Sequence, residues 1–321
     1  IVVNPVILQG AGVPFDTVFT ATIIASVIGT LWMSLFANYP IAIAPGMGLN
    51  AYFAFSVVGQ ADVPYEVAFG AVFVAGILFI LLSLTPFREK LIEAIPDNLK
   101  LGITAGIGLF IAFIGLRMTG IITDHPENLV GLGDLHSPSA VLALVGLAIT
   151  LILMSLNVNG ALFLGMAATG VIAFFSGQLT FPDGFIALPA APDFFVFGNP
   201  FTAFLDVVEY SLYAVVFSFL IVTLFDTTGT MIGVAEQAGL MKKGKLPKAR
   251  QALLADSVAT TVGAVFGTSP TSAYIESSAG VAAGGRTGLT TLVVSTLFVV
   301  SAFFGPMVSA VSGFSAITAP A

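Results

Sequence analysis

Long apolar runs, each close to the length of one membrane crossing, alternate with short polar segments along the chain. A helix needs about 20 apolar residues to cross a hydrocarbon core of about 30 Å. Eight segments approach or reach this length, and we expect each to be a helix: 17–37, 67–84, 99–116, 140–156, 161–175, 207–223, 249–266 and 287–304. The pattern predicts an all-α polytopic membrane protein.

Two other segments are long enough to reach the middle of a membrane but make poor helices. Prolines and glycines interrupt the first, 38–55, while Pro270 and a run of small polar residues interrupt the second, 267–285. Irregular backbone at this depth is tolerated where it is buried in protein or lines a cavity. Because the two segments run in opposite directions, we predict an inverted repeat whose broken helices meet near the membrane midplane.

Composition and charge support this topology. Only 8% of the 321 residues are charged and 57% are hydrophobic, whereas soluble domains have about 25% charged residues. Short cytoplasmic loops collect Lys and Arg, and nine of the ten basic residues agree with one orientation: Arg88, Lys90, Lys100, Lys242, Lys243, Lys245, Lys248, Arg250 and Arg286. Arg117 is the exception. We therefore expect a multi-pass protein of the cytoplasmic (plasma or inner) membrane.

Several classes of chemistry have no support in the sequence. The chain has no Cys and only two His, so neither a thiolate nor a His-based metal site is expected. No basic surface suggests nucleic acid, and no nucleotide or cofactor motif is present. The chain opens on Ile1 without an initiator Met and stops at Ala321 without a polar tail. We therefore expect segments to be missing at both ends.

Asp226 is an acid in the middle of a predicted span. It lies 17 residues after Glu209 and 16 before Lys242, about 25 Å from each at about 1.5 Å per residue. An ionised carboxylate at the bilayer centre costs about 2.5–3.5 kcal/mol on insertion scales, so Asp226 is a functional candidate by default. The alternative is a structural acid that Thr227 or Thr230 hydrogen-bonds.

Glu276 is the second acid at this depth. It lies ten residues before Arg286, about 15 Å if the segment is helical. Because it follows the break at Pro270, we expect it in the first turn of a half-helix, where free N–H groups favour negative charge. The alternative is a helix-capping acid. Burial and a nearby second acid both favour a protonated carboxyl, so proton coupling through Glu276 and Asp226 is a hypothesis with a mechanism.

Further side chains complete the predicted site. Asn50 lies at matching depth in the other broken segment and can donate and accept, although it could instead cap local backbone. Phe53 could stack on a flat ligand or serve packing alone. Thr230, one turn from Asp226, could orient that acid, and Ser272 could offer a hydroxyl.

Asp256, on the predicted ninth span with Thr260 one turn further on, is a third candidate acid. We consider two roles for Asp256: support of the site in proton coupling, or pairing with Lys or Arg of the cytoplasmic loop.

These motifs resemble those of the nucleobase–ascorbate (nucleobase:cation symporter) transporters. The tenth-span signature is similar to GTSPTSAYIESSAGV at 267–281, and the eighth-span motif to FDTTGT at 225–230. The branch named for azaguanine uptake, the purine permeases, is similar at NYP (38–40) and APGMGLNAYF (44–53). Thr223 departs from the Asp that many relatives of this branch carry there.

The resemblance implies a fold of seven plus seven spans in two inverted repeats, with short antiparallel strands in the third and tenth spans. It implies a core domain from 1–86 (end of span 1 to span 4) and 201–305 (spans 8–11). The gate domain would comprise 87–200 (spans 5–7) and 306–321 (the incomplete span 12). A homodimer in membrane lipid with elevator-like movement of the core is also implied.

The resemblance further implies proton-coupled import of hypoxanthine, guanine or adenine. By motif position, Asp226 and Glu276 would bind the purine edge with Asn50 assisting. A uracil or xanthine permease of the same fold is the alternative. An anion carrier would more naturally place a basic residue at mid-membrane, a channel fits the mid-depth acids less well, and an enzyme would need a nucleophile–base pair or a metal set.

Overall fold

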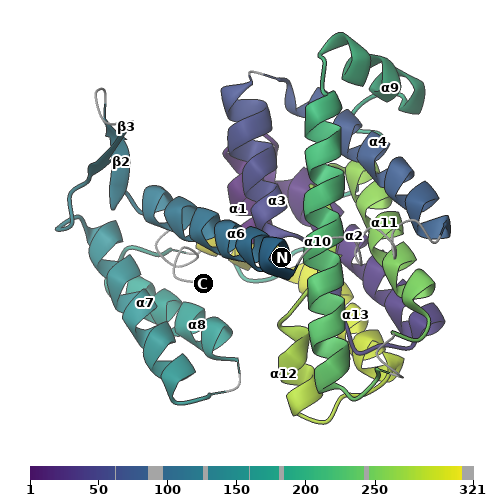
Figure 1. The fold of residues 1–321 in the computed structure, drawn as a ribbon. Coiled ribbons are helices and arrows are strands. Elements are labelled where there is room, and N and C mark those ends of the chain that lie inside the picture. The colour runs from purple at the N-terminus through teal and green to yellow at the C-terminus, as the bar shows by residue number, and fades with distance from the viewer. Residues whose placement is uncertain are drawn as a thin grey trace. The chain divides into compact units, whose positions relative to one another are not determined.

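The long apolar segments form helices, as predicted (Figure 1). The structure is a computed structural model that describes residues 1–61, 63–85, 97–125, 129–158, 160–180, 184–241 and 246–312. Most of the loop cations that underlie the predicted orientation, namely Arg88, Lys90, Lys242, Lys243 and Lys245, lie outside the described residues.

The elements follow one another along the chain with connections of different lengths, and a long one joins α8 to α9. The α-helices are α1 (Val3–Gln9), α2 (Phe15–Trp32), α3 (Met47–Ala51), α4 (Tyr65–Leu84), α6 (Asp97–Met118), α7 (Pro138–Ser155), α8 (Ala161–Phe175), α9 (Pro200–Glu209), α10 (Tyr213–Gln237), α11 (Ala249–Phe266), α12 (Ser277–Ala282), α13 (Gly288–Ser301) and α14 (Gly305–Ser312). The π-helical segments η1 (Met33–Ala37) and η2 (Tyr52–Gln60) extend α2 and α3, and the 3-10 turn η3 (Ala302–Phe304) joins α13 to α14. Among the described residues, five segments are long and apolar enough to cross a membrane: Phe15–Ala37, Tyr65–Leu84, Pro138–Ser155, Tyr213–Gln237 and Gly288–Val311.

Two features differ from the expected pattern. The segment expected to begin a span at 207 is divided, because Ser211 adopts a positive φ of 54° between α9 and α10. The acidic loop after α6 contains an antiparallel hairpin of β2 (Ile122–His125) and β3 (Leu129–Leu132). The protein is therefore mostly helical, with strands at two places among the described residues.

The two broken segments meet, as predicted. The strand β1 (Ile43–Pro45) in the first pairs antiparallel with β4 (Thr271–Ala273) in the second, and Ala44 lies opposite Ser272. The prediction of short antiparallel strands in the third and tenth spans is confirmed.

Backbone hydrogen bonds extend this pairing at both ends. The Gly46 N–H donates to the Pro270 carbonyl at 3.0 Å, and the Tyr274 N–H donates to the Ala42 carbonyl at 3.0 Å. Proline lacks an N–H and interrupts the helical ladder. Each broken segment therefore satisfies polar backbone groups that the other leaves free, which an apolar surrounding requires.

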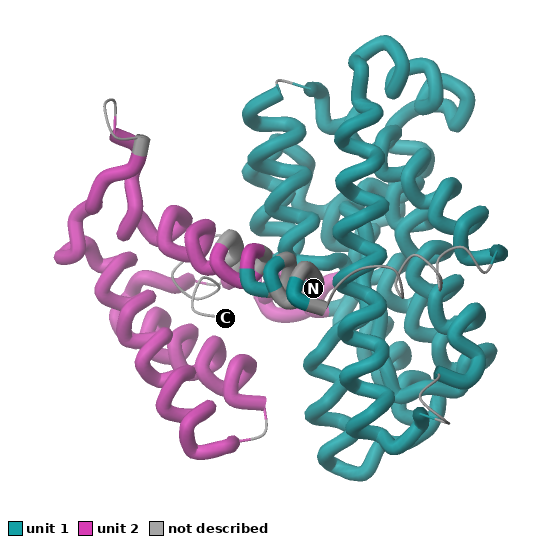
Figure 2. The backbone as a smooth tube through the Cα atoms, in the orientation of Figure 1, with its two compact units in different colours: residues 1, 3–105, 188–303 teal, residues 2, 106–187, 304–321 magenta. Residues whose placement is uncertain are grey.

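The chain forms two compact units, and each is discontinuous in sequence (Figure 2). Unit 1 contains residues 1, 3–105 and 188–303, and unit 2 contains residues 2, 106–187 and 304–321. Whether these units are the core and gate domains stays a prediction.

Close packing of α11 organises unit 1. Helix α11 lies against both α2 and α4. A Cβ added at Gly29 of α2 would lie 2.7 Å from the Ala259 Cβ, and one added at Gly76 of α4 would lie 2.5 Å from the Thr261 Oγ1. Small residues thus let three helices approach closely, as is common where lipid weakens the hydrophobic drive for helix association.

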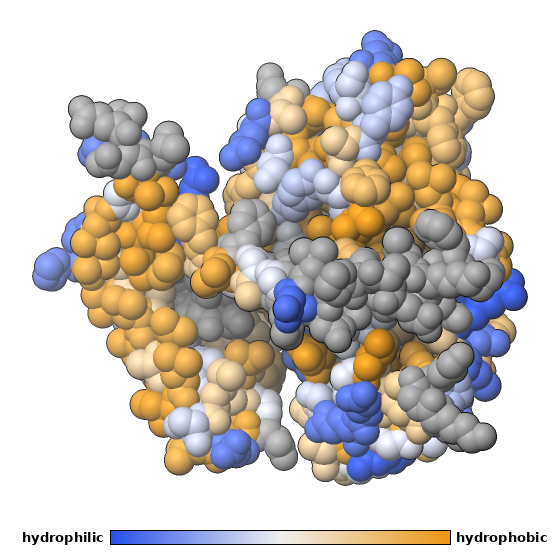
Figure 3. All heavy atoms as spheres, in the orientation of Figure 1, coloured by the Kyte–Doolittle hydropathy of each residue, from blue (hydrophilic) through white to orange (hydrophobic). Residues whose placement is uncertain are grey.

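Unit 2 contains a helix pair with an apolar outer face. Helices α7 and α8 pack side by side, and Gly165 of α8 lies against Thr150 of α7. Large apolar side chains such as Leu151, Phe163 and Phe175 are exposed, and Figure 3 shows hydrophobic surface over these helices. Such a face suits a lipid environment.

Candidate functional site

Asp226 lies near the middle of α10 and is partly buried. The Ser272 side chain of β4 lies close enough to interact with it, and the charge of Glu276 acts on the same carboxyl. Three predicted site residues from two separate parts of the chain therefore come together. The Thr227 hydroxyl donates its proton to Asp256 at 2.6 Å. This bond does not support the alternative in which Thr227 hydrogen-bonds Asp226.

Glu276 immediately precedes α12, at the position predicted from the break. Its side chain makes no capping hydrogen bond and is exposed on unit 1, which does not support a purely capping role. The neighbouring Tyr274 hydroxyl donates to the Pro45 carbonyl at 2.6 Å and interacts electrostatically with both Glu276 and Asp226. The second broken segment is thereby anchored to the first beside the two acids.

Asn50 faces the other broken segment. It lies in α3, is fully buried, and its Oδ1 accepts a hydrogen bond from the Ser269 hydroxyl. Its Nδ2 has no hydrogen-bond partner among the described residues. The contact with Ser269 does not support a role in capping local backbone.

Asp256 of α11 is fully buried beneath the site. It accepts hydrogen bonds from the Thr227 hydroxyl at 2.6 Å and from the Thr271 hydroxyl at 3.0 Å. Thr271 is also 2.9 Å from the Thr260 hydroxyl. Asp256 thus connects α10 and β4 to α11. Its role in proton coupling stays a prediction, and most lysines of the alternative lie outside the described residues.

Thr230 and Phe53 occupy different surroundings. Thr230 is buried on α10, one turn beyond Asp226. Phe53 is fully buried in the core of unit 1 and stacks on Phe69 with ring centroids 4.6 Å apart. Packing therefore accounts for Phe53, and its contact with a ligand stays a prediction.

One buried polar residue was missed in the sequence. Asn4 of α1 is 2% exposed and donates to the Thr22 hydroxyl at 2.6 Å and the Thr268 hydroxyl at 2.8 Å. An amide in an otherwise apolar stretch was the available signal. Asn4 joins the first segment of the chain to the residues that precede β4.

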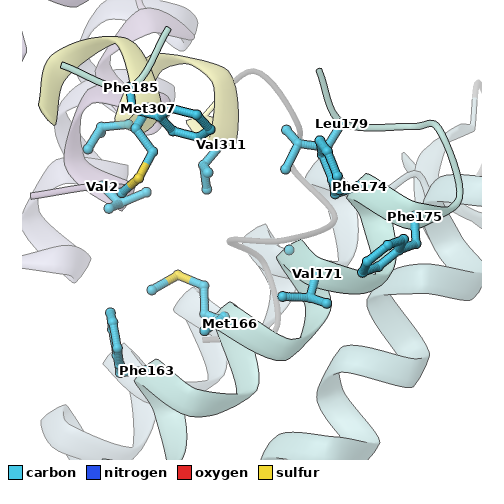
Figure 4. A pocket seen from close by; sticks show the side chains of 13 residues that line it. Val2, Phe163, Met166, Val171, Phe174, Phe175, Leu179, Phe185, Met307 and Val311 are labelled. Atoms are coloured by element: carbon cyan, nitrogen blue, oxygen red, sulfur yellow. The ribbon is translucent and has the colours of Figure 1, made fainter. Parts of the chain in front are cut away.

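A cavity of about 410 Å³ in unit 2 has a different character (Figure 4). Its lining is entirely apolar: Val2, Phe163, Met166, Ala167, Gly170, Val171, Phe174, Phe175, Leu179, Phe185, Met307, Val308 and Val311. A ligand with polar edges would lose its hydrogen bonds to water there without replacement. The paired broken segments of unit 1 are therefore the better candidate site.

Comparison with known proteins identifies the family of this chain. A sequence model of the permease family matches residues 1–321. The guanine/hypoxanthine permease PbuO of Bacillus subtilis (strain 168) is 71% identical over 100% of this chain and 75% of its own length. The adenine permease AdeP of Escherichia coli (strain K12) is 42% identical over 98% of this chain and 70% of its own.

A solved structure shows the same fold at low identity. The transmembrane domain of the cyanobacterial bicarbonate transporter BicA matches with a TM-score of 0.70 and 15% identity, covering 100% of this chain and 83% of that one. This likeness confirms the fold of seven plus seven inverted-repeat spans.

Proposed function

This chain belongs to the permease family of nucleobase–ascorbate transporters, and on that premise we propose that it carries purine nucleobases across the cell membrane. The relatives described above are named for guanine, hypoxanthine and adenine. These bases share a flat double ring whose edge carries N–H donors beside nitrogen acceptors, and guanine and hypoxanthine add an oxygen acceptor. A site for them needs both kinds of partner in a confined place.

The interaction of Asp226, Ser272 and Glu276 beside the pairing of the two broken segments carries the proposal. An ionised carboxylate only accepts hydrogen bonds, so Asp226 and Glu276 suit ring N–H groups. The Asn50 amide comes from the opposite broken segment and adds a partner of either sense. Carboxylates that bind a base in an apolar surrounding would form charge-assisted hydrogen bonds, which are about twice as strong as neutral ones.

Proton coupling is part of the same proposal. Two interacting acids at membrane depth favour a shared proton. We propose that one of them takes up a proton with the base outside the cell and releases it with the base inside. Asp256 supports this step through Thr227, which follows Asp226 in α10.

We further propose an elevator mechanism in a homodimer. Unit 1 has its own core and contains all the proposed substrate-binding residues, so it could move the site as a rigid body. Unit 2 would provide the scaffold.

Uptake of radiolabelled hypoxanthine, guanine and adenine into proteoliposomes tests the function. We expect saturable uptake that unlabelled purines inhibit and that an inward proton gradient increases. The controls are liposomes without protein and proteoliposomes without a proton gradient. Equal, non-saturating flux of unrelated solutes would contradict a carrier and indicate a channel.

The alternative is a uracil or xanthine permease of the same fold. Unlabelled uracil and xanthine, added in the same assay, distinguish the two. We expect both to inhibit hypoxanthine uptake less than guanine does, and stronger inhibition by either would favour the alternative.

A further inference from the structure

A chain of buried side-chain hydrogen bonds connects Asn4 on α1 to Asn50 on α3 through Ser269. Asn4 is 2% exposed, and both Asn50 and Ser269 are 0% exposed. The Ser269 Oγ lies 3.4 Å from the Asn4 Oδ1 and also hydrogen-bonds the Asn50 Oδ1. This series of hydrogen bonds therefore links the proposed site to α1, a helix that contributes no residue to the predicted site.

Thr22 determines which way the Asn4 amide faces. A threonine hydroxyl has one proton, and Thr22 donates it to the Val18 carbonyl at 2.6 Å. Its oxygen must then accept from Asn4, and only the amide nitrogen can donate. The Asn4 Nδ2 also donates to Thr268, so the Asn4 carbonyl is left facing Ser269.

Ser269 has one proton for two carbonyl oxygens. An asparagine amide turned by half a turn about its last bond fills the same volume with oxygen and nitrogen exchanged. With Asn50 turned in this way, its Nδ2 donates to Ser269 and Ser269 donates to Asn4, so each link has one proton. In the opposite orientation Ser269 can donate to only one of the two carbonyl oxygens. The amide atom on the far side of Asn50 has no hydrogen-bond partner among the described residues, and after the turn this atom is the carbonyl oxygen, which is available to accept from a ligand.

We infer that Asn4, acting through Ser269, holds the Asn50 amide with its carbonyl oxygen directed to the substrate. Asn4 is then a positioning residue that sets specificity: the site accepts a base with an N–H at the contacted ring position and disfavours one with a lone pair there. The inference rests on the proposed function, because Asn50 is taken to contact the base.

Affinity measurements on the purified full chain test this inference. Thermal stabilisation by hypoxanthine is compared with stabilisation by analogues in which one ring N–H at a time is methylated or replaced by C–H. The Asn50→Ala variant identifies the contacted ring position. One analogue binds the wild-type chain more weakly than hypoxanthine does but binds Asn50→Ala equally well, and its altered position is the one that Asn50 contacts. We expect Asn4→Ala and Ser269→Ala each to reduce the same discrimination roughly threefold to tenfold, and the double variant to reduce it no further.

Ser34→Ala is the matched control. Ser34 is a buried serine of unit 1 that donates to the Gly288 carbonyl at 2.6 Å, so its loss should affect stability and leave discrimination unchanged. Discrimination retained by both Asn4→Ala and Ser269→Ala, or by Asn50→Ala, would overturn the inference alone. If Asn4→Ala does not fold, Ser269→Ala decides. A wild-type chain that no purine stabilises would instead overturn the proposed function and the inference with it.

Discussion

Buried hydroxyl groups find their partners in different places in unit 2 and unit 1. In unit 2, Thr150 donates to the Gly146 carbonyl at 2.9 Å, and Thr169 donates to the Gly165 carbonyl at 2.7 Å. Each bond stays within one helix and spans four residues, so it satisfies the hydroxyl without fixing any neighbouring element.

Unit 1 contains bonds of this kind too, but many of its hydroxyls reach another element. Thr30 of α2 accepts from the Ile43 N–H of β1 at 3.0 Å, and Thr227 of α10 donates to Asp256 of α11 at 2.6 Å. Such bonds fix one element against another, which a bond within a single helix cannot do. The difference indicates that unit 1 is built to position polar groups and unit 2 to present apolar faces.

Removing the charge of Asp226 or Glu276 should have the largest effect on purine uptake, and it tests most directly whether the polar groups of unit 1 form the site. Asp226→Asn and Glu276→Gln keep size and polarity but remove the charge-assisted acceptor, so we expect purine uptake to fall about 10- to 100-fold for each. Uptake into proteoliposomes, normalised to inserted protein, measures this.

Asp124→Asn in unit 2 is the control for these variants. Asp124 pairs with Arg117 at 3.1 Å, and both are exposed, so uptake should be unchanged. Normal uptake by both acid variants of unit 1 would contradict the site assignment.

Helix contacts at glycine should show what the two units share. A Cβ at Gly165 would lie 2.0 Å from the Thr150 Oγ1, and one at Gly76 would lie 2.5 Å from the Thr261 Oγ1. We expect Gly165→Val and Gly76→Val each to lower the free energy of unfolding by about 1–3 kcal/mol through overpacking. Thermal unfolding in detergent measures the change.

Gly233→Ala is the control for the glycine variants, since a Cβ there meets nothing within 4 Å. It should be neutral or slightly stabilising, because alanine is the better helix former. A unit 2 that tolerates Gly165→Val would show that its helices are packed loosely, and the two units would then differ in packing as well as in polarity.

The sequence predicts local backbone features of this fold better than it predicts which residues contact each other. Prolines and glycines in 38–55 and 267–285 predicted both breaks because they act on their own backbone. The division between α9 and α10 was missed because Ser211 takes its positive φ of 54° without a glycine or proline to signal it.

The candidate site shows the same limit. Counting residues from the loop markers located Asp226 within its helix, and the structure brings it to Ser272 and Glu276. Asn4 was missed because its significance depends on Thr268, which lies 264 residues further along the chain. Depth follows from sequence spacing, whereas the choice of hydrogen-bond partner follows from tertiary packing.

Replacing threonine by its isostere should sharpen the comparison of hydroxyls. Thr271→Val in unit 1 removes hydrogen bonds to the Asp256 carboxyl and to Thr260, so we expect the free energy of unfolding to fall by about 1–3 kcal/mol. Thr169→Val in unit 2 removes a bond to a carbonyl of its own helix, and we expect a loss below about 1 kcal/mol. Denaturant titration in detergent compares them, and equal losses would contradict the distinction between the units.

The smallest effect is expected at the hairpin of unit 2. The Arg117 guanidinium meets the Asp124 carboxylate at 3.1 Å with both side chains well exposed, and exposed ion pairs contribute about 0–1 kcal/mol. Arg117→Met should therefore change the free energy of unfolding by less than about 1 kcal/mol, and raising the salt concentration should shrink the difference further. Thermal unfolding at low and high salt measures both. A loss as large as that of Thr271→Val, independent of salt, would mean that a polar contact fixes elements in unit 2 as firmly as in unit 1.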